Sequence, residues 1–473
     1  MLTDQQVERW GIFEVALSGP TDGNPFEDIQ LTAVFQYRND QIKVRGFYDG
    51  DGVYKVRFMP DREGVWTYTT DSNEPHLSGL QGTFICTAAQ QNNHGPVRVK
   101  DNYLFAYEDG TSYLPFGTTC YHWTHTGDAE NEQQTITELK QSPFNKVRMC
   151  ILPTKTMRPP MVAYAGTVPE DVDIKKFNPL FFQHLEQKLI DLMELGVEAD
   201  LILFHPYDKE EGWGFNNLTV EEDCYYLQYV MARLGAFRNV WWSLSNEYDF
   251  NKMKDIPHWD RLLQFVQRED PYQRLRSIHN GTRMYETSSL YDFSKSWITH
   301  QSIQHWDAAT VTEWRENVRK PIVIDEISYE GNVSKRWGNI TALELMHRYW
   351  EAIARGGFAS HGECFEKKPR SWISSGGKLY GESPARIQFL REVLEAGPQD
   401  WMKAKEDGNY ALLYLGKYRL SSYQLPMPAD RSYKVELIDI WNMTITVLKE
   451  TYTGQSVIPL PAKPYTAIRI QAN

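Results

Sequence analysis

Residues 239–247 read NVWWSLSNE and residues 321–326 read PIVIDE, and a glutamate closes each of these largely apolar runs. Short, continuous apolar runs are typical of parallel β-strands that are buried on both faces. Six more runs of this kind lie at residues 114–119, 145–152, 198–204, 275–279, 297–301 and 357–363. Helical patterns, or loops long enough to hold a helix, separate them. Eight alternations over about 300 residues predict an α/β fold, a (β/α)₈ TIM barrel, with an open doubly wound sheet as the alternative.

The segments between these runs carry helix start signals. Asn178 followed by Pro179 supplies an N-cap and a proline at the first helical position, and both favour helix initiation. The pattern Thr-x-x-Glu at residues 219–222 and 341–344 is that of a capping box, which marks two further helix starts. These signals strengthen the prediction that strands alternate with helices.

The segments on either side of the barrel have the pattern of β-structure. Residues 13–17 (FEVAL) alternate between inward and outward positions, and similar alternation with Asp- and Gly-rich turns continues to about residue 87. A period of two with such turns is typical of an antiparallel sandwich. Strand-like runs return after residue 398. We therefore predict three domains, an N-terminal Ig-like β-sandwich at 1–92, the barrel at 93–400 and a small C-terminal β-sandwich at 401–473.

Charge and cysteine usage disfavour several classes of partner and location. The chain has 62 acidic and 50 basic residues, a formal net charge of −12. Nucleic acids and anionic membranes attract a basic face, so we expect neither as a partner. No window approaches the roughly 18 apolar residues of a membrane helix, and the first residues lack the pattern of a secretory signal. The five cysteines are scattered and form no C-x-x-C pair, which is typical of reduced cysteines in a cytoplasmic protein.

Polar residues stand where the predicted strands end. In a (β/α)₈ barrel the active site forms at the carboxyl ends of the strands. In chain order, the residues at or just beyond these ends are His122, Trp123, Arg148, His205, Asn246, Glu247, His279, Asn280, His300, Glu326, His361 and Glu363. Trp372 follows the last strand and is a candidate for stacking on a sugar ring. We expect these side chains to line one substrate-binding cleft, because burying so many polar groups is otherwise costly.

Glu247 and Glu326 define the expected chemistry. Glycoside hydrolysis needs one carboxyl that donates a proton and another that attacks the anomeric carbon or activates water. Glu247 follows an apolar strand with two tryptophans, where desolvation would raise its pKa as the acid role requires. On strands 4 and 7 the two carboxyls can face each other at the roughly 5–5.5 Å of a retaining enzyme. Asp325 precedes Glu326, but the period of two points it to the opposite face.

The Asn-Glu pair at the end of strand 4 and the glutamate at the end of strand 7 resemble the pattern of clan A glycoside hydrolases. Over nearly the whole chain, the order of domains resembles a group of bacterial glycoside hydrolases, in which a sandwich with Trp-Gly-x-Phe-Glu (residues 10–14) precedes the barrel and a small β domain follows it. The resemblance implies Glu247 as acid/base, Glu326 as nucleophile, Asn246 as a partner of the substrate 2-hydroxyl and Arg148 as a buried support of the nucleophile. Many members have a tyrosine at the end of strand 6, where this sequence offers His300.

Two of the candidate residues keep open alternatives. Glu363 is either a third carboxylate of the site that binds a sugar hydroxyl or the partner of a cation, for which Lys367, Lys368 and Arg370 are the candidates. His122 and His125 have a spacing that suggests metal binding, but they lack the His-x-His pair of barrel metallohydrolases and a nearby acidic partner. We therefore expect no metal and no cofactor.

Three functions compete at this point. The favoured one is a retaining glycoside hydrolase that acts on an oligosaccharide or glycoside by double displacement with two glutamates. The second is a non-catalytic carbohydrate-binding protein on the same scaffold, and the third is a metal-dependent barrel hydrolase. The presence of both glutamates favours the first function over the second, and the missing ligand motif disfavours the third. The glutamates indicate how a bond is cut and not which sugar carries it, and the sequence does not indicate an oligomeric state.

Overall fold

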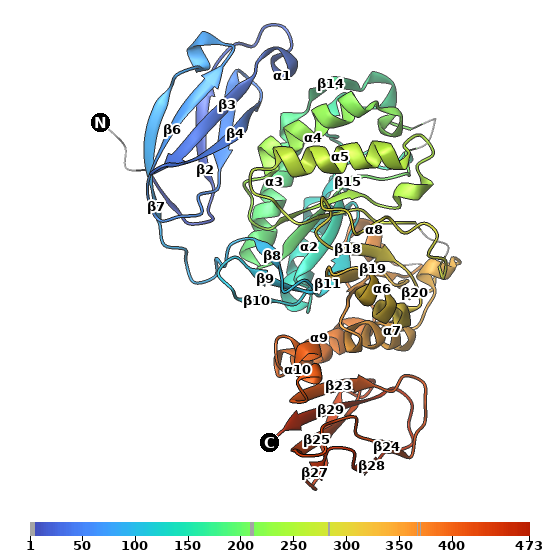
Figure 1. Ribbon diagram of the computed structural model, residues 1–473. Helices are drawn as coiled ribbons and strands as arrows, with labels where there is room; N and C mark the ends of the chain where they lie inside the picture. The colour runs from blue at the N-terminus through green and yellow to red at the C-terminus, as the bar shows by residue number, and fades with distance from the viewer. Residues whose placement is uncertain (1–4, 209–211, 282–283, 367, 369) are drawn as a thin grey trace.

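The computed structural model describes residues 5–208, 212–281, 284–366, 368 and 370–473. A β domain at the N-terminus, a central barrel and a β domain at the C-terminus follow one another along the molecule (Figure 1). Lys367, one of the cations considered as a partner of Glu363, lies outside the described residues. No helix within the described ranges is both long and apolar enough to cross a bilayer.

The N-terminal domain is a seven-stranded sheet in the order β1-β7-β6-β3-β4-β5-β2. Its strands are β1 (Gln6–Glu8), β2 (Phe13–Ser18), β3 (Leu31–Tyr37), β4 (Asp40–Tyr48), β5 (Val53–Phe58), β6 (Gly64–Ser72) and β7 (Gln81–Thr87), with helix α1 (Pro25–Asp28) between β2 and β3. The sheet folds over on itself, because Phe13 of β2 stacks on Phe84 of β7 with ring centroids 3.9 Å apart although these strands are not neighbours. The predicted β-structure is confirmed, and the Ig-like topology stays a prediction.

Eight parallel strands form the central barrel. The sheet has the order β17-β16-β15-β12-β11-β21-β19-β18, and a bridge between His279 and Ser302 closes it by joining the segment after β17 to β18. The strands are β11 (Gly117–Thr119), β12 (Lys146–Cys150), β15 (Glu198–Phe204), β16 (Val240–Ser245), β17 (Arg276–Ser277), β18 (Gln301–Gln304), β19 (Ile322–Glu326) and β21 (Phe358–His361). The predicted barrel is therefore confirmed, and the open sheet considered as the alternative is wrong.

Helices cover the outside of the barrel (Figure 1). They are α2 (Ala129–Gln141), α3 (Pro179–Glu194), α4 (Val220–Leu234), α5 (Ile256–Glu269), α6 (Val311–Asn317), α7 (Ala342–Ala354), α9 (Ser383–Glu395) and α10 (Trp401–Glu406). The short helix α8 (Trp372–Ser375) instead packs against β11. The Asn178 side chain caps α3, and residues 219–222 form a reciprocal capping box at α4. At α7, Thr341 accepts a hydrogen bond from the Glu344 N–H, so all three predicted helix starts are confirmed.

The sixth strand lies later in the chain than predicted. The apolar pattern placed it at residues 297–301, but β18 begins at Gln301. The preceding run is buried for another reason, because it lies at the amino-terminal end of the barrel. There the His300 ring lies 5.4 Å from the Trp241 ring and 5.9 Å from the Phe105 ring. His300 therefore precedes strand 6, and the expectation that it closes this strand and lines the cleft is wrong.

A small antiparallel sheet closes the same end of the barrel. It consists of β8 (Val97–Lys100), β9 (Leu104–Tyr107) and β10 (Ser112–Tyr113). Phe105 of β9 contacts Trp241 of β16 at 5.3 Å and Phe358 of β21 at 5.9 Å between ring centroids. A substrate must therefore enter from the opposite end, where the strands have their carboxyl termini.

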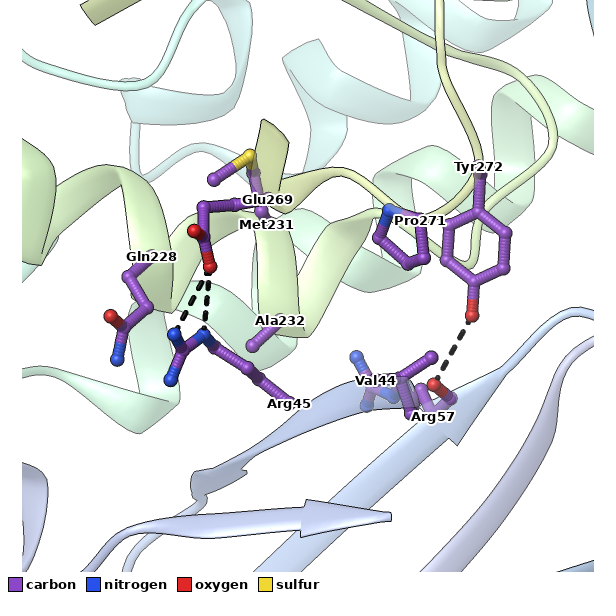
Figure 2. Close-up of a pocket in the computed structure, with 9 residues that line it drawn as sticks. All are labelled: Val44, Arg45, Arg57, Gln228, Met231, Ala232, Glu269, Pro271 and Tyr272. Atoms are coloured by element: carbon purple, nitrogen blue, oxygen red, sulfur yellow. Dashed lines mark hydrogen bonds and ion pairs between the residues drawn. The ribbon is translucent and has the colours of Figure 1, made fainter. Parts of the chain in front are cut away.

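The N-terminal domain docks on α3, α4 and α5 of the barrel. Arg57 of β5 forms an ion pair with Glu186 of α3 at 2.7 Å, and both side chains are buried. Arg45 of β4 binds Glu269 of α5 at 3.1 Å, and the Tyr272 hydroxyl donates to the Arg57 carbonyl at 3.4 Å (Figure 2). A buried charged contact of this kind holds two domains in one relative orientation, because separating them leaves charges without partners.

The C-terminal domain packs below α7 and α10 (Figure 1). Its sheet contains β23 (Tyr410–Tyr414), β25 (Ser432–Asp439), β26 (Thr444–Val447), β27 (Tyr452–Thr453) and β29 (Thr466–Ala472), and β24 (Ser422–Gln424) pairs with β28 (Val457–Pro459). Two short ladders, β13 (Tyr164–Ala165) with β14 (Asp173–Phe177) and β20 (Glu330–Gly331) with β22 (Glu363–Cys364), belong to the barrel loops. The domain limits at 92 and 400 fit these elements and stay predictions.

Candidate active site

Glu247 and Glu326 stand at the carboxyl ends of two barrel strands. Glu326 is the last residue of β19, and Glu247 is the second residue after β16, following Asn246. Glu247 has φ 43° and ψ 49°, a left-handed conformation that costs a residue with a Cβ roughly 1–2 kcal/mol. The next residue holds this turn, because the Tyr248 N–H donates to the His279 carbonyl at 3.0 Å. Such strain is typical of sites where a side chain must be aimed.

The Glu247 side chain is partly exposed, but its carboxyl is enclosed and accepts two hydrogen bonds. The Tyr207 hydroxyl donates to Oε2 at 2.6 Å, and the Gln304 amide donates to Oε1 at 3.1 Å. Burial raises the pKa of this carboxyl, the charge of Glu326 raises it further, and the two hydrogen bonds only partly oppose them, so that the pKa is about 7. A carboxyl of this kind holds a proton near neutral pH and can give it up, as a general acid must.

Glu326 lies in a different environment, with three donors at one oxygen. Oε1 lies 3.4 Å from Arg148 Nη1 and 3.4 Å from His279 Nε2, and it accepts the Tyr121 hydroxyl. Burial alone would raise the pKa of Glu326, but the His279 contact and the Arg148 charge outweigh it and lower the pKa to about 2. This carboxyl therefore stays ionised, the state that a nucleophile needs.

A single amide joins the two carboxyls. Gln304 Nε2 donates to Glu247 Oε1 at 3.1 Å and to Glu326 Oε2 at 2.6 Å. These two oxygens are therefore no farther apart than about 5.7 Å, the sum of the two distances, which is close to the roughly 5–5.5 Å of retaining enzymes and below the roughly 6.5–9.5 Å of inverting ones.

Arg148 and Asn246 connect the two sides of the site. Arg148 is fully buried, and its Nη2 donates to Asn246 Oδ1 at 2.9 Å. Asn246 Nδ2 donates to the Tyr207 hydroxyl at 2.8 Å, and that hydroxyl binds Glu247. A continuous chain of hydrogen bonds therefore runs from the guanidinium beside Glu326 to the carboxyl of Glu247. The structure brings together these residues, as the sequence predicted for all except Tyr207.

Strict alternation with Glu326 predicts that the Asp325 side chain points to the outside of the barrel, and the structure shows that it does not. It is fully buried inside the barrel, where it binds Lys146 Nζ at 2.7 Å and Ser302 Oγ at 2.6 Å. The strand pairing explains this, because Gln304 pairs with Glu326 and leaves Asp325 as an extra residue in β19. Such a bulge turns side chains away from strict alternation. The Asp325 carboxylate supports Arg148 from below, with 3.9 Å to its Nε.

Of the residues predicted at strands 1, 3 and 5, those of strand 5 contact Glu326 and Gln304, and those of strands 1 and 3 pack behind the site. His279 contacts Glu326, as described above, and Asn280 binds the backbone of Gln304 at 3.0 and 3.1 Å. The His122 and His205 rings lie near each other, 6.1 Å apart, behind Tyr207. Trp123 is 0% exposed, so it offers no free face to a sugar in this conformation.

The residues predicted at strand 8 pack inside the protein. Trp372 Nε1 and His361 Nδ1 both contact the Thr118 hydroxyl, at 2.8 and 2.9 Å, and neither ring is exposed. The Glu363 carboxylate accepts the backbone N–H groups of Tyr380 and Gly381 at 2.6 and 2.7 Å. The expectations that Trp372 stacks on a sugar and that Glu363 binds a sugar hydroxyl are wrong, because both side chains are enclosed.

The cation alternatives for Glu363 are not realised either among the residues with a described position. Arg370 pairs with Asp128 at 2.6 Å, and the Lys368 ammonium lies 4.2 Å from the centre of the Tyr380 ring. The carboxyl has its partners in the backbone that leads into α9, whose N–H groups oppose, but do not outweigh, the rise in its pKa that burial causes.

Tyr121, Tyr207, Gln304 and Tyr329 belong to the site and were not predicted. Tyr121 follows strand 1 and donates to Glu326, and its hydroxyl lies 3.1 Å from that of Tyr329. The resemblance implied a tyrosine at the end of strand 6, whereas in this structure Tyr121 beyond strand 1 donates to Glu326. A correct placement of strand 6 at residues 301–304 would have indicated Gln304 from the sequence.

Two buried groups within the described residues have metal-ligand side chains within 4.8 Å of one another, His122 with Cys150 and His205, and Glu330 with His361 and Glu363. Both ring nitrogens of His205 have protein partners, the Leu152 carbonyl at 3.0 Å and the Tyr207 N–H at 3.3 Å. The carboxylates of Glu330 and Glu363 accept hydrogen bonds from the backbone at residues 380–383. Contacts within the protein thus account for the ligand atoms of His205, Glu330 and Glu363, whereas His122 Nε2 and His361 Nε2 are buried without a hydrogen-bond partner among the described residues. The absence of a metal stays a prediction.

Comparison with known protein families finds matches to the barrel and to both flanking domains. A family model described as apiosidase-like, catalytic domain matches residues 99–362. Two domains of unknown function, DUF5060 and DUF5605, match residues 6–73 and 400–471. No curated protein matches the chain.

Solved structures agree with the family match. An inferred glycoside hydrolase from Bacteroides vulgatus has a TM-score of 0.90 and 34% identity, with 99% of this chain and 100% of that chain covered. A family 5 glycoside hydrolase from the same species has a TM-score of 0.62 and 14% identity, with 80% and 93% covered, and it shows the fold alone. The family match and the 34% identical structure define the protein as a glycoside hydrolase. Within that class, the chain belongs to the apiosidase-like catalytic domain family.

Proposed function

We propose that this protein cleaves a glycosidic bond of an oligosaccharide with retention of configuration, through a covalent glycosyl-enzyme intermediate. Glu326 is the nucleophile, and Glu247 is the general acid and then the general base. The observation that carries the proposal is the bridge through Gln304, which limits the facing oxygens to about 5.7 Å, the sum of its two contacts, and so leaves little room for the water of an inverting mechanism. The opposite pKa shifts of the two carboxyls support the same division of roles.

In the first step Glu326 attacks the anomeric carbon, while Glu247 gives its proton to the leaving oxygen. The bond from the anomeric carbon to the leaving oxygen breaks, and an ester bond to Glu326 forms. Arg148, His279 and Tyr121 at Oε1 hold the attacking carboxylate in place. Positioned donors of this kind act without reorganisation during the reaction.

In the second step water attacks the same carbon. The Glu247 carboxylate takes the proton of the water, the ester bond breaks, and the Glu326 carboxylate returns. The three donors at Oε1 stabilise the negative charge that Glu326 regains. Two inversions give net retention.

Turnover of a panel of aryl glycosides tests this proposal, with an apioside included because of the family match. The Glu326→Gln variant is expected to lose turnover, because an amide cannot attack the anomeric carbon. Glu198→Gln serves as the matched control, since Glu198 is an equally buried glutamate at the amino-terminal end of β15. It should keep wild-type rates.

Two further measurements separate the proposal from its rivals. NMR of the first-formed sugar should show the anomer of the substrate, and a slow 2-fluoro glycoside should add one glycosyl mass to the peptide that carries Glu326. The opposite anomer would contradict double displacement. Absence of turnover across a broad panel would favour a carbohydrate-binding protein, and loss of turnover with a chelator would favour a metal-dependent hydrolase.

A further inference from the structure

Gln304 is held rigidly between the two carboxyls. Its backbone N–H donates to Asn280 Oδ1 at 3.0 Å, and Asn280 Nδ2 donates to its carbonyl at 3.1 Å. The residue is 8% exposed. Asn280 thus fixes the backbone of Gln304, and the two hydrogen bonds from its side-chain NH₂ group place that group between Glu247 and Glu326. Within the described ranges, Gln304 is the one residue that donates to both carboxyls.

The chemistry of an amide sets the direction of these two bonds. Both partners are carboxylate oxygens, so the NH₂ end of Gln304 must face them, and that end can only donate. Two carboxyls this close would otherwise approach and share one proton, as paired carboxylates do. We infer that Gln304 is a positioning residue that divides the roles of the two glutamates, because its donors occupy the facing oxygens and prevent a shared proton. This inference rests on the proposed two-glutamate mechanism.

For Glu247, the amide decides which oxygen carries the proton. Oε1 receives the Gln304 N–H, so the proton of the acid form belongs on Oε2. Oε2 lies 2.6 Å from the Tyr207 hydroxyl, which accepts from Asn246 Nδ2 at 2.8 Å. The Tyr207 hydroxyl can accept a hydrogen bond from the protonated Oε2 when Glu247 is in the acid form, and it can donate a hydrogen bond to Oε2 when Glu247 is ionised. Oε2 is therefore the atom that protonates the leaving oxygen.

For Glu326, the contact with the Gln304 amide indicates that Oε2 is the oxygen that attacks. Three donors engage Oε1, whereas Oε2 has the Gln304 contact at 2.6 Å. Oε2 also faces Glu247, so it forms the bond to the anomeric carbon when the leaving oxygen takes the Glu247 proton. Electrons flow from Oε2 to carbon and from the broken bond to the leaving oxygen, and no other reactant is needed.

The other charged and titratable groups around the two carboxyls each act mainly on one of them. Glu247 faces Tyr207 and Asp249, and Glu326 faces the groups at its Oε1 and, through Tyr121, the Tyr329 hydroxyl. Loss of Gln304 is therefore the change that affects both carboxyls at once. Each carboxyl loses a donor to its charged form, which raises both pKa values.

The test compares wild type with Gln304→Leu, Gln304→Glu and the control Gln301→Leu, by kcat/KM against pH. Gln301 lies on the same strand at its other end, where its amide donates to two backbone carbonyls at 3.3 Å. In Gln304→Leu both limbs of the pH profile should move to higher pH by about one unit. Gln304→Glu should keep activity best at lower pH, where the new carboxyl is protonated and can donate. Gln301→Leu should leave both limbs in place.

A direct titration makes the inference independent of turnover. NMR of labelled glutamate carboxyls should show the Glu247 signal titrating at higher pH in Gln304→Leu than in wild type, with Gln301→Leu unchanged. Equal rate loss at every pH together with unmoved titration would overturn the inference and leave a structural role. Failure of the proposed function is a different result, in which wild type lacks turnover or forms no adduct at Glu326 whatever the titration shows.

Discussion

Replacing Tyr121 by Phe removes one hydroxyl that donates to Glu326 and keeps the aromatic ring. The hydroxyl is one of three donors at Oε1, beside Arg148 and His279. In the proposed second step Glu326 regains its charge as the ester breaks, so the lost donor should slow this step most. The first step should suffer less, because a carboxylate with fewer donors is also more basic.

The expected size follows from the kind of bond that is lost. A hydrogen bond to a charged group contributes about 1.5–3 kcal/mol, and each 1.4 kcal/mol corresponds to about tenfold in rate. The second step should therefore slow by about tenfold to about a hundredfold. The ester intermediate should accumulate, so KM should fall together with kcat.

Rapid mixing with an aryl glycoside measures this effect as a burst of released phenol followed by a slow steady state. Tyr113→Phe is the matched control, because the Tyr113 hydroxyl donates to the Asn145 carbonyl at 3.0 Å near the other end of the barrel. It should cost about 1 kcal/mol of unfolding free energy and leave kcat unchanged. Unchanged kcat without a burst in Tyr121→Phe would refute the reasoning, and so would an equal loss of kcat in both variants.

Two further predictions concern stability. Arg57→Leu should lower the unfolding free energy by about 3 kcal/mol, because it leaves the buried Glu186 carboxylate with one partner fewer. Arg45→Leu, at the more exposed pair with Glu269, should cost less than about 1 kcal/mol. Equal denaturant midpoints for the two variants would contradict this prediction. Burial raises the pKa of Glu363 to about 7, so the contribution of this carboxyl to stability is complete below its ordinary pKa and is lost as pH rises through about 7. Glu363→Gln should remove about 3 kcal/mol of that pH dependence. Denaturation curves at pH 5 and pH 8 measure the pH dependence, and a variant with the same difference between the two pH values as wild type would contradict the prediction.

The fold could be predicted where local pattern and tertiary structure agree. The apolar runs that end at Glu247 and Glu326 are buried strands, because a strand covered on both faces by barrel and helices must be apolar throughout. The same rule failed at residues 297–301, which are apolar because they lie at the closed end of the barrel and not because they form a strand. Apolar character reports burial and cannot by itself distinguish a strand from a packed loop.

The sequence by itself determined the barrel, the two glutamates and their places at strand ends, because these depend on periodicity and on the order of strands. Only the tertiary structure decided which other polar residues reach the carboxyls. Tyr121 and Gln304 contact Glu326 from strands 1 and 6, while Trp372 and Glu363 are enclosed although they follow strand 8. Side-chain direction at a strand end depends on bulges, loop closure and neighbouring helices, and these are properties of the folded chain.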